Sequence, residues 1–266
     1  MSALSAKTLW KIFVLSKPVE DQPLFLASVT SADEAELCLS GGADIIDAKD
    51  PRAGALGALA HDHVRAIVRR VGGRLPVSAT IGDLPPDPRQ LADAATVMAA
   101  AGVDIVKIGF FGDDDPQPAI VALGQVNLGS AKLVAVIMAD RDPDFSLIPL
   151  FAANDFLGVM LDTADKSNGA LTDALTPARI ADFVSLVHGQ GLIAGLAGSL
   201  RLEHVAPLAA LQADILGFRG ALCERDRTAA LDVAKLRSVR AALDHVSLIK
   251  RPAAIRRPAA SGRPAA

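Results

Sequence analysis

The chain has 266 residues, of which 51% are hydrophobic, 21% charged and 4% aromatic, and this composition excludes a disordered or fibrous protein. The formal net charge of −3 comes without a long run of like charges in the body of the chain, so nothing indicates a nucleic-acid surface. Two cysteines are too few for a disulfide framework or a zinc cluster, and we expect reduced thiols in a cytoplasmic protein.

The two ends of the chain differ from its middle. Residues 1–21 are predicted to be a short extension, because their apolar run is too short for the core of a signal peptide. No run approaches the ~18 apolar residues of a membrane helix, so no membrane partner is expected. In residues 249–266 the sequence Arg-Pro-Ala-Ala occurs three times, and its prolines and small side chains predict a basic, disordered tail.

Residues 22–248 repeat one unit, in which a short apolar run is followed by a turn and an alanine- and leucine-rich stretch of helical character. The predicted strands are Leu24–Val29, Asp44–Lys49, Val77–Ile81, Asp104–Gly109, Leu133–Met138, Phe156–Asp162, Leu192–Ala197 and Asp214–Phe218. Helices are expected between them, with a last one near Ala229–Leu243. Eight units favour a single α/β domain, a (β/α)8 TIM-type barrel, whose closed sheet has no edge. An open doubly wound sheet is the alternative, but no G-x-G-x-x-G follows the first strand.

Three of these strands begin alike. The shared pattern is a small residue, then an aspartate, then a buried apolar run, as in Gly42-Ala43-Asp44-Ile45, Gly102-Val103-Asp104-Ile105 and Gln212-Ala213-Asp214-Ile215. We interpret the small residue as the end of a helix and the aspartate as the start of the strand. The repetition supports one closed sheet rather than two domains.

Charged residues interrupt the strands near their carboxyl ends, where (β/α)8 barrels place their active sites. Because side chains alternate along a strand, Asp47 and Lys49 share one face and would point into the barrel mouth. By the same count Lys107 points inward from the fourth strand. Asp162 ends the sixth strand, and Lys166 follows four residues later. We predict that these five residues form the catalytic group.

Three lysines and two carboxylates at one mouth indicate chemistry, although an ion-pair layer that only fills the barrel would use the same residues. A lysine that is desolvated or lies beside another cation has a lowered pKa, and its neutral amine attacks aldehydes and ketones. Schiff-base catalysis is therefore the first hypothesis. Decarboxylation of the orotidine-phosphate decarboxylase type is a weaker one, because that motif is D-x-K-x-x-D and position 52 here is arginine.

Glycine-rich turns follow the last two strands, where barrels bind phosphate through backbone N–H groups. Gly198 and Ser199 follow the seventh strand, and Arg219 and Gly220 follow the eighth. Small residues let the backbone approach an oxyanion, and an arginine adds a charge-assisted fork. Barrel turns also use glycine for purely structural reasons, but the joint placement favours a phosphorylated substrate.

Other polar residues carry less weight. Cys38 and Cys223 are expected to pack in the interior. Asp83, after the third strand, either orders the mouth or is a plain turn residue, and Asp140 is expected to be a solvated loop charge. The histidines are expected on the surface or on outer helices, and no metal site is predicted.

At the predicted site residues the sequence resembles the (5-formylfuran-3-yl)methyl phosphate synthase family of methanofuran biosynthesis. The resemblance covers about residues 24–228. Its motifs are Gly41-Gly42-Ala43-Asp44-Ile45-Ile46-Asp47-Ala48-Lys49-Asp50-Pro51, Gly54-Ala55-Leu56-Gly57, Val77-Ser78-Ala79-Thr80-Ile81-Gly82-Asp83, Val106-Lys107-Ile108-Gly109, Met160-Leu161-Asp162-Thr163-Ala164, Leu196-Ala197-Gly198-Ser199 and Arg219-Gly220-Ala221. The stretch Glu224-Arg225-Asp226-Arg227 departs from the family pattern, which has a glycine-rich stretch before its Asp-Arg pair.

The resemblance implies a lyase that joins two glyceraldehyde 3-phosphate molecules into a furan aldehyde phosphate, with loss of one phosphate and two waters. It implies Lys49 as the Schiff-base lysine, Lys107 and Lys166 in phosphate binding or proton movement, and Asp47 and Asp162 in proton transfer. It requires no metal or organic cofactor, and the expected partner is a small phosphorylated aldehyde. A homo-oligomer is compatible with the sequence. A class I-type aldolase acting on another sugar phosphate and a non-catalytic barrel scaffold stay open as alternatives.

Overall fold

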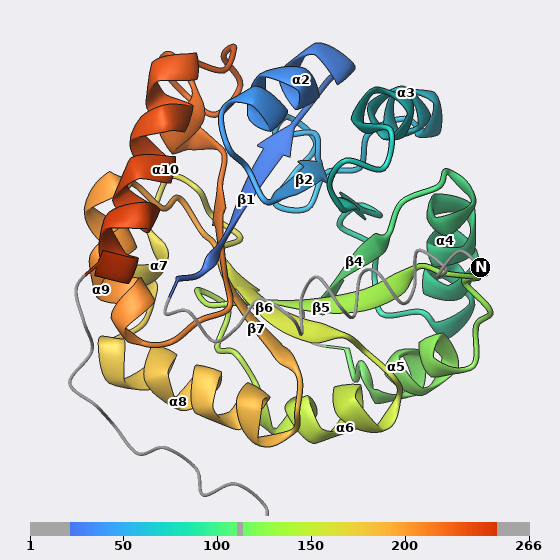
Figure 1. Cartoon of the computed structure of the whole chain (residues 1–266). Coiled ribbons are helices and arrows are strands. Elements are labelled where there is room, and N and C mark those ends of the chain that lie inside the picture. Colours follow the sequence, from blue (N-terminus) through green and yellow to red (C-terminus); the bar gives the residue numbers. More distant parts are fainter. Residues whose placement is uncertain (1–21, 111–113, 249–266) are drawn as a thin grey trace, which may run out of the picture.

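The computed structural model describes residues 22–110 and 114–248, which form a closed barrel of eight parallel strands surrounded by helices (Figure 1). Each strand pairs with the next, and β8 closes the sheet against β1. The strands are β1 (Leu24–Val29), β2 (Ile45–Ala48), β3 (Val77–Thr80), β4 (Ile105–Phe110), β5 (Lys132–Met138), β6 (Gly158–Asp162), β7 (Ile193–Leu196) and β8 (Ile215–Phe218). The predicted (β/α)8 barrel is confirmed, and each strand end lies within two residues of its predicted place.

Helices follow the strands and cover the outside of the barrel (Figure 1). They are α2 (Ala32–Ser40), α3 (His61–Val71), α4 (Pro88–Ala100), α5 (Gln117–Gly124), α6 (Ile148–Ala153), α7 (Leu171–Ala174), α8 (Pro177–Gly189), α9 (Val205–Ala210) and α10 (Val233–Leu248), with 3₁₀ turns η1 (Phe145–Leu147), η2 (Leu202–His204) and η3 (Gly220–Leu222). Ser31, Asp87 and Thr176 cap α2, α4 and α8 by accepting hydrogen bonds from backbone N–H groups of the first turn.

The last helix begins four residues later than the sequence predicts. Residues 223–232 form a loop that folds back on itself, with an antiparallel bridge between Cys223 and Leu231. Cys223 is fully buried, as is Cys38, so the predicted packing role of both cysteines is confirmed. This loop carries several of the residues that line the barrel mouth.

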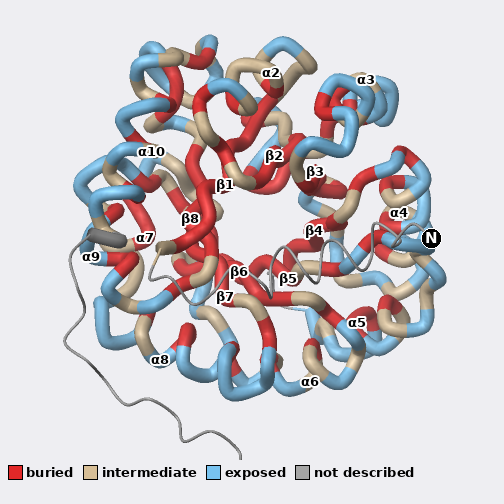
Figure 2. The backbone as a smooth tube through the Cα atoms, in the orientation of Figure 1, coloured by how far each residue is buried: buried red, intermediate tan, exposed pale blue. Residues whose placement is uncertain are grey.

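The barrel has two separate apolar cores, which follow from the alternation of side chains along the strands. On β1, Phe25 and Ala27 belong to the larger core between the sheet and the helices, whereas Leu24 and Leu26 belong to a smaller one inside the barrel. Figure 2 shows the buried residues concentrated on the strands and on the helix faces turned toward them. The inner core closes the floor of the barrel and leaves its carboxyl end for polar groups.

The repeated aspartates close the amino-terminal end of the barrel. Each accepts a hydrogen bond from the backbone N–H of a residue on the preceding strand and donates its own N–H to the carbonyl of that same residue. The pairs are Asp44 with Phe25 (2.9 Å for both bonds), Asp104 with Val77 (2.8 Å for both) and Asp214 with Ala194 (2.7 and 2.8 Å). Two residues earlier, Gly42, Gly102 and Gln212 have positive φ, so each chain reverses sharply into its strand.

The predicted extension at residues 1–21 and the predicted tail at residues 249–266 lie outside the described residues. Within the described ranges, no helix is long and apolar enough to cross a membrane.

Candidate active site

A cavity of about 800 Å³ opens at the carboxyl ends of the strands. Its walls contain all nine residues predicted from the sequence, namely Asp47, Lys49, Lys107, Asp162, Lys166, Gly198, Ser199, Arg219 and Gly220. They come from β2, β4 and β6 and from the segments that follow β2, β6, β7 and β8. The barrel therefore brings together groups that are up to 173 residues apart in the sequence, between Asp47 and Gly220.

Asp47 is the centre of a buried polar group on the floor of the cavity. The neighbouring strands β1 and β3 place Ser28 and Ser78 in register with it. The two hydroxyls donate to its carboxylate at 2.8 and 2.6 Å, and Lys107 Nζ donates at 3.1 Å. The side chains of Asp47 and Lys107 are only 1% and 4% exposed. Burial acts to raise the pKa of Asp47, but Lys107, Lys49 and the hydroxyls together outweigh it and hold the pKa below its usual range.

Asp162 is the centre of a second group, nearer the opening. Its Oδ2 accepts a hydrogen bond from Lys49 Nζ at 3.1 Å, and its Oδ1 accepts from Lys166 Nζ and from the backbone N–H of Thr163. Burial alone would raise the pKa of Asp162, but Lys49, Lys166 and Lys107 lower it strongly. One carboxylate thus serves two ammonium groups, whose side chains are 11% and 15% exposed.

Lys166 differs from an ordinary surface lysine. Its pKa is lowered, first because burial disfavours the ammonium and then because Lys49 lies close by, against the opposing effect of Asp162. Lys49 and Lys166 thus form a pair of amines competing for one negative charge. The lowered pKa of Lys166 favours release of its proton, which is the condition for a nucleophilic or basic amine.

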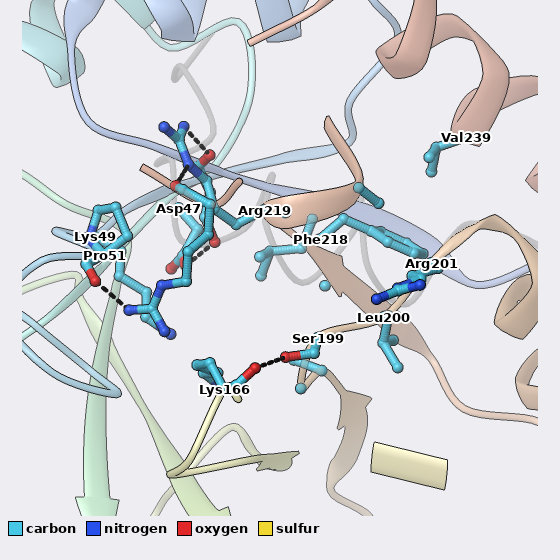
Figure 3. A pocket seen from close by; sticks show the side chains of 18 of the residues that line it. Asp47, Lys49, Pro51, Lys166, Ser199, Leu200, Arg201, Phe218, Arg219 and Val239 are labelled. Atoms are coloured by element: carbon cyan, nitrogen blue, oxygen red, sulfur yellow. Dashed lines mark hydrogen bonds between the residues drawn. The ribbon is translucent and has the colours of Figure 1, made fainter. Parts of the chain in front are cut away.

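The turns after β7 and β8 expose backbone donors to the cavity. The N–H groups of Gly198, Ser199, Gly220 and Ala221 donate no hydrogen bond to any acceptor in the described part of the chain. Gly198 and Ser199 both have positive φ, and a side chain at position 198 would collide with Thr163. Figure 3 shows Ser199 beside Lys166, whose backbone carbonyl accepts from the serine hydroxyl at 3.5 Å. These features fit the predicted phosphate loops.

Arg219 lies at the cavity, but its guanidinium is engaged elsewhere. It forms a fork with both carboxylate oxygens of Glu34, at 2.6 and 3.1 Å. Its remaining N–H groups donate to the backbone carbonyls of Ser28, Arg227 and Ala229. All five donors of the side chain are therefore used. The phosphate-binding role expected for Arg219 stays a prediction, while its contacts show that it holds the loop after β8 in place.

Two aspartates outside the catalytic group fix the loops that carry its lysines. The carboxylate of Asp83 accepts from the N–H groups of Ala55 and Leu56, at 2.8 and 2.7 Å, in the loop after β2. Asp83 therefore orders the mouth, one of the two roles considered for it. The carboxylate of Asp140 accepts from the N–H groups of Ala164 and Asp165 in the loop that carries Lys166. The expectation that Asp140 is a solvated loop charge is wrong. The residue is half-buried, and these two N–H groups are its specific partners.

Sequence reasoning did not place Glu34, which pairs with Arg219, or five charged residues that line the cavity, namely Arg201, Arg225, Asp226, Arg227 and Lys235. Glu34 lies in the first turn of α2, where an acidic residue ordinarily serves the helix terminus. Arg227 lines the cavity from the loop before α10, inside the stretch that departs from the family pattern. No motif marked Glu34, and Arg227 stood out only as part of the Asp-Arg pair of the family pattern, since the contacts of both residues depend on the closing of β8 against β1.

This arrangement defines a (β/α)8 barrel whose mouth combines lysine–carboxylate clusters with free backbone donors. The family model described as 4-HFC-P synthase matches residues 25–240. The chain therefore belongs to this family, and it is an enzyme of the synthase type.

Individual relatives agree with the family model. A protein of Methylorubrum extorquens, provisionally named (5-formylfuran-3-yl)methyl phosphate synthase, is 44% identical over 216 residues, covering 81% of this chain and 89% of the relative. The (5-formylfuran-3-yl)methyl phosphate synthases of Methanopyrus kandleri and Methanocaldococcus jannaschii are 38% and 35% identical, covering 77% and 76% of this chain and 91% and 90% of the relatives.

Solved structures of low sequence identity share the fold. Phosphoribosyl anthranilate isomerase from Thermus thermophilus superimposes with a TM-score of 0.60 at 17% identity, covering 84% of this chain and 99% of that one. Thiamine phosphate pyrophosphorylase from Pyrococcus furiosus gives a TM-score of 0.58 at 12% identity, covering 85% and 98%. At these identities the likeness concerns the barrel architecture alone.

Proposed function

We propose that this enzyme is a lyase that condenses two molecules of glyceraldehyde 3-phosphate into (5-formylfuran-3-yl)methyl phosphate, with loss of one inorganic phosphate and two waters, as a step of methanofuran biosynthesis. Two three-carbon units supply the six carbons of the product. The observation that carries the proposal is the pair of partly buried amines on one carboxylate, Lys49 and Lys166 on Asp162, in a chain that belongs to the synthase family.

Lys49 is the nucleophile in this proposal. Its amine adds to the aldehyde of the first triose phosphate, and loss of water gives an iminium ion. The iminium acidifies the adjacent carbon, so that a proton can leave and phosphate can be eliminated. The second triose phosphate isomerises to its ketone form by proton transfer, and the carbon nucleophile attacks its carbonyl carbon C2, because attack on the aldehyde would place the phosphomethyl group at the wrong ring carbon. Ring closure through the C1 hydroxyl with loss of two waters, and hydrolysis of the imine to release the lysine, give the aromatic furan.

The other charged groups transfer protons. Lys166 has a lowered pKa and lies on the same carboxylate as Lys49, so it can take a proton from Lys49 or from substrate. Asp162 would stabilise the iminium that replaces the ammonium of Lys49. Lys107 and Asp47, at the floor of the cavity, would exchange protons with the substrate oxygens.

One substrate phosphate would bind at the turns after β7 and β8. Gly198, Ser199 and Gly220 offer backbone donors without partners in the described chain, as phosphate loops of barrels do. The fixed charge of Arg219 lies beside these turns and would favour an anion there, although its N–H groups already have partners.

Borohydride trapping tests the nucleophile. Sodium borohydride added during turnover of glyceraldehyde 3-phosphate should reduce the imine, and peptide mass spectrometry should find the adduct on Lys49. The variant Lys49→Arg should form neither adduct nor the ultraviolet-absorbing furan aldehyde. Lys132→Arg is the matched control, because Lys132 is exposed at the opposite end of the barrel and should behave as the wild type.

Three outcomes would change the proposal. An adduct found only on Lys166 would show that Lys166, and not Lys49, is the nucleophile of the same mechanism. An adduct with a product other than the furan would indicate a class I-type aldolase. Full activity of Lys49→Arg without any adduct would overturn Schiff-base catalysis.

A further inference from the structure

Arg227 reaches across the barrel mouth from the loop after η3 to the loop after β2. Its Nη2 donates to the backbone carbonyl of Gly54 at 2.9 Å and to that of Pro51, a bond marked by the dashed line at Pro51 in Figure 3. These carbonyls lie five and two residues after Lys49. The guanidinium is therefore held next to the loop that carries the proposed nucleophile, in the wall of the same cavity.

The charge of Arg227 is not neutralised by a close carboxylate. Arg219 forms an ion pair with Glu34 at 2.6 Å and Arg240 one with Asp44 at 3.0 Å, but no carboxylate in the described ranges lies within ion-pair distance of Arg227. Asp162, Asp83 and Asp50 act on it only from farther away. Burial and the nearby charge of Arg219 lower the pKa of Arg227, against the opposing effect of Asp162.

The guanidinium also has unused donors. Nε and Nη1 have no hydrogen-bond partner among the described residues, neither is fully buried, and the residue lines the cavity. Anchoring by two backbone carbonyls fixes the group without using its charge. A fixed, uncompensated guanidinium with free N–H groups is a binding site for a phosphate or carboxylate.

We propose that Arg227 binds a second phosphomonoester group. This group belongs to the second triose phosphate, which the carbon nucleophile formed on Lys49 attacks. This inference rests on the proposed function, in which two phosphorylated aldehydes meet in one cavity. The turns after β7 and β8 supply one set of hydrogen-bond donors for a phosphate. Arg227 supplies a second set on the side of the cavity near the loop after β2. Because Arg227 also holds Pro51 and Gly54, a phosphate bound there would place the second triose beside Lys49.

The test separates the two substrate molecules. In Arg227→Ala, the concentration of glyceraldehyde 3-phosphate that half-saturates borohydride trapping on Lys49 should change by less than about twofold. The concentration that half-saturates furan formation should rise about 10- to 100-fold, as expected for a lost charge-assisted contact. Arg227→Lys should lie between the alanine variant and the wild type, and the exposed α10 residue Arg237 gives the control variant Arg237→Ala.

A binding measurement keeps this proposal apart from the reaction itself. Calorimetric titration with inorganic phosphate should find two sites in the wild-type enzyme and in Arg237→Ala, and one in Arg227→Ala. Two sites in Arg227→Ala would overturn the proposal, as would equal weakening of trapping and furan formation. Absence of imine and furan in the wild type would refute the proposed function, while the phosphate titration would still decide the role of Arg227. Circular dichroism of each variant verifies that it is folded.

Discussion

The two ends of the barrel use aspartates for opposite purposes. At the amino-terminal end, Asp44, Asp104 and Asp214 accept hydrogen bonds from the first backbone N–H groups of neighbouring strands. At the carboxyl end, Asp47 and Asp162 accept hydrogen bonds from lysines. The first set closes the sheet, and the second holds amines in a cavity. The two sets differ in position along the strand and also in burial, since Asp47 and Asp162 are buried and the other three are half-buried.

The electrostatics of the two ends differ accordingly. The pKa of Asp104 is raised, because burial outweighs the backbone N–H groups that favour its charged form. The pKa of Asp162 is lowered despite complete burial, because the positive charges of Lys49, Lys166 and Lys107 outweigh desolvation. A backbone dipole stabilises a carboxylate less than a full charge does at the same distance. Among the described residues Asp104 is held without an ion pair and Asp44 has one, with Arg240, whereas both carboxylates of the mouth depend on lysines.

The largest effect is expected when a lysine is removed from the mouth. Lys107→Met leaves the buried carboxylate of Asp47 without its ion-pair partner, which should lower the free energy of unfolding by about 3–5 kcal/mol. Turnover should fall by at least about 100-fold, since a proton-transfer group is lost. Urea unfolding and a furan product assay measure the two effects.

The double variant Asp47→Asn with Lys107→Met provides the control. It removes both charges and retains a side chain that Ser28 and Ser78 can contact, so most of the lost stability should return while turnover stays low. If Lys107→Met alone were as stable as the wild type, Lys107 would not be the dominant partner of Asp47.

A smaller effect, confined to stability, is expected at the other end. Asp104→Ala removes the acceptor for the N–H of Val77 and should lower the free energy of unfolding by about 1–3 kcal/mol. Asp104→Asn keeps an acceptor oxygen and should lose less than about 1 kcal/mol. Turnover per folded molecule should not change in either variant, because the residue lies at the end of the barrel away from the cavity. Reduced turnover in folded Asp104→Ala would erase the functional distinction between the two ends.

The smallest effect is a change in the pH dependence of stability. The folded-state pKa values of Asp47 and Asp162 are lowered, so their contribution is fully present above about pH 4 and is lost as the pH falls further. The folded-state pKa of Asp104 is raised, so the folded protein binds its proton more readily and this contribution declines as the pH rises from about 4 toward neutrality.

The comparison of the wild type with Asp104→Asn isolates this second contribution. The stability deficit of the variant should shrink as the pH rises from about 4 to 7, measured by urea unfolding at each pH. A deficit that grew with pH would mean that the folded-state pKa of Asp104 is lowered and that both ends of the barrel stabilise their carboxylates alike.

The local pattern of apolar and charged residues was sufficient to predict the strands of the fold and part of the candidate site. The apolar runs predicted all eight strands, and alternation along β2 correctly placed Asp47 and Lys49 on the cavity side. Alternation could not show that these two neighbours have different partners, Asp47 with Lys107 and Lys49 with Asp162. That pairing depends on the distances between strands that are far apart in the sequence.

By itself, the sequence determined the number and order of the strands, the face on which each charged side chain lies, and the family, because these follow from local periodicity and motifs. The tertiary structure alone decided which charges meet. Arg219 appeared suited to a substrate phosphate, yet closure of β8 against β1 brings Glu34 within 2.6 Å of it. Arg227 stood out in the sequence only as part of an Asp-Arg pair, yet it crosses to the loop of Lys49. Charges separated by more than a hundred residues interact only after the barrel closes, and Coulomb energy depends on that final distance.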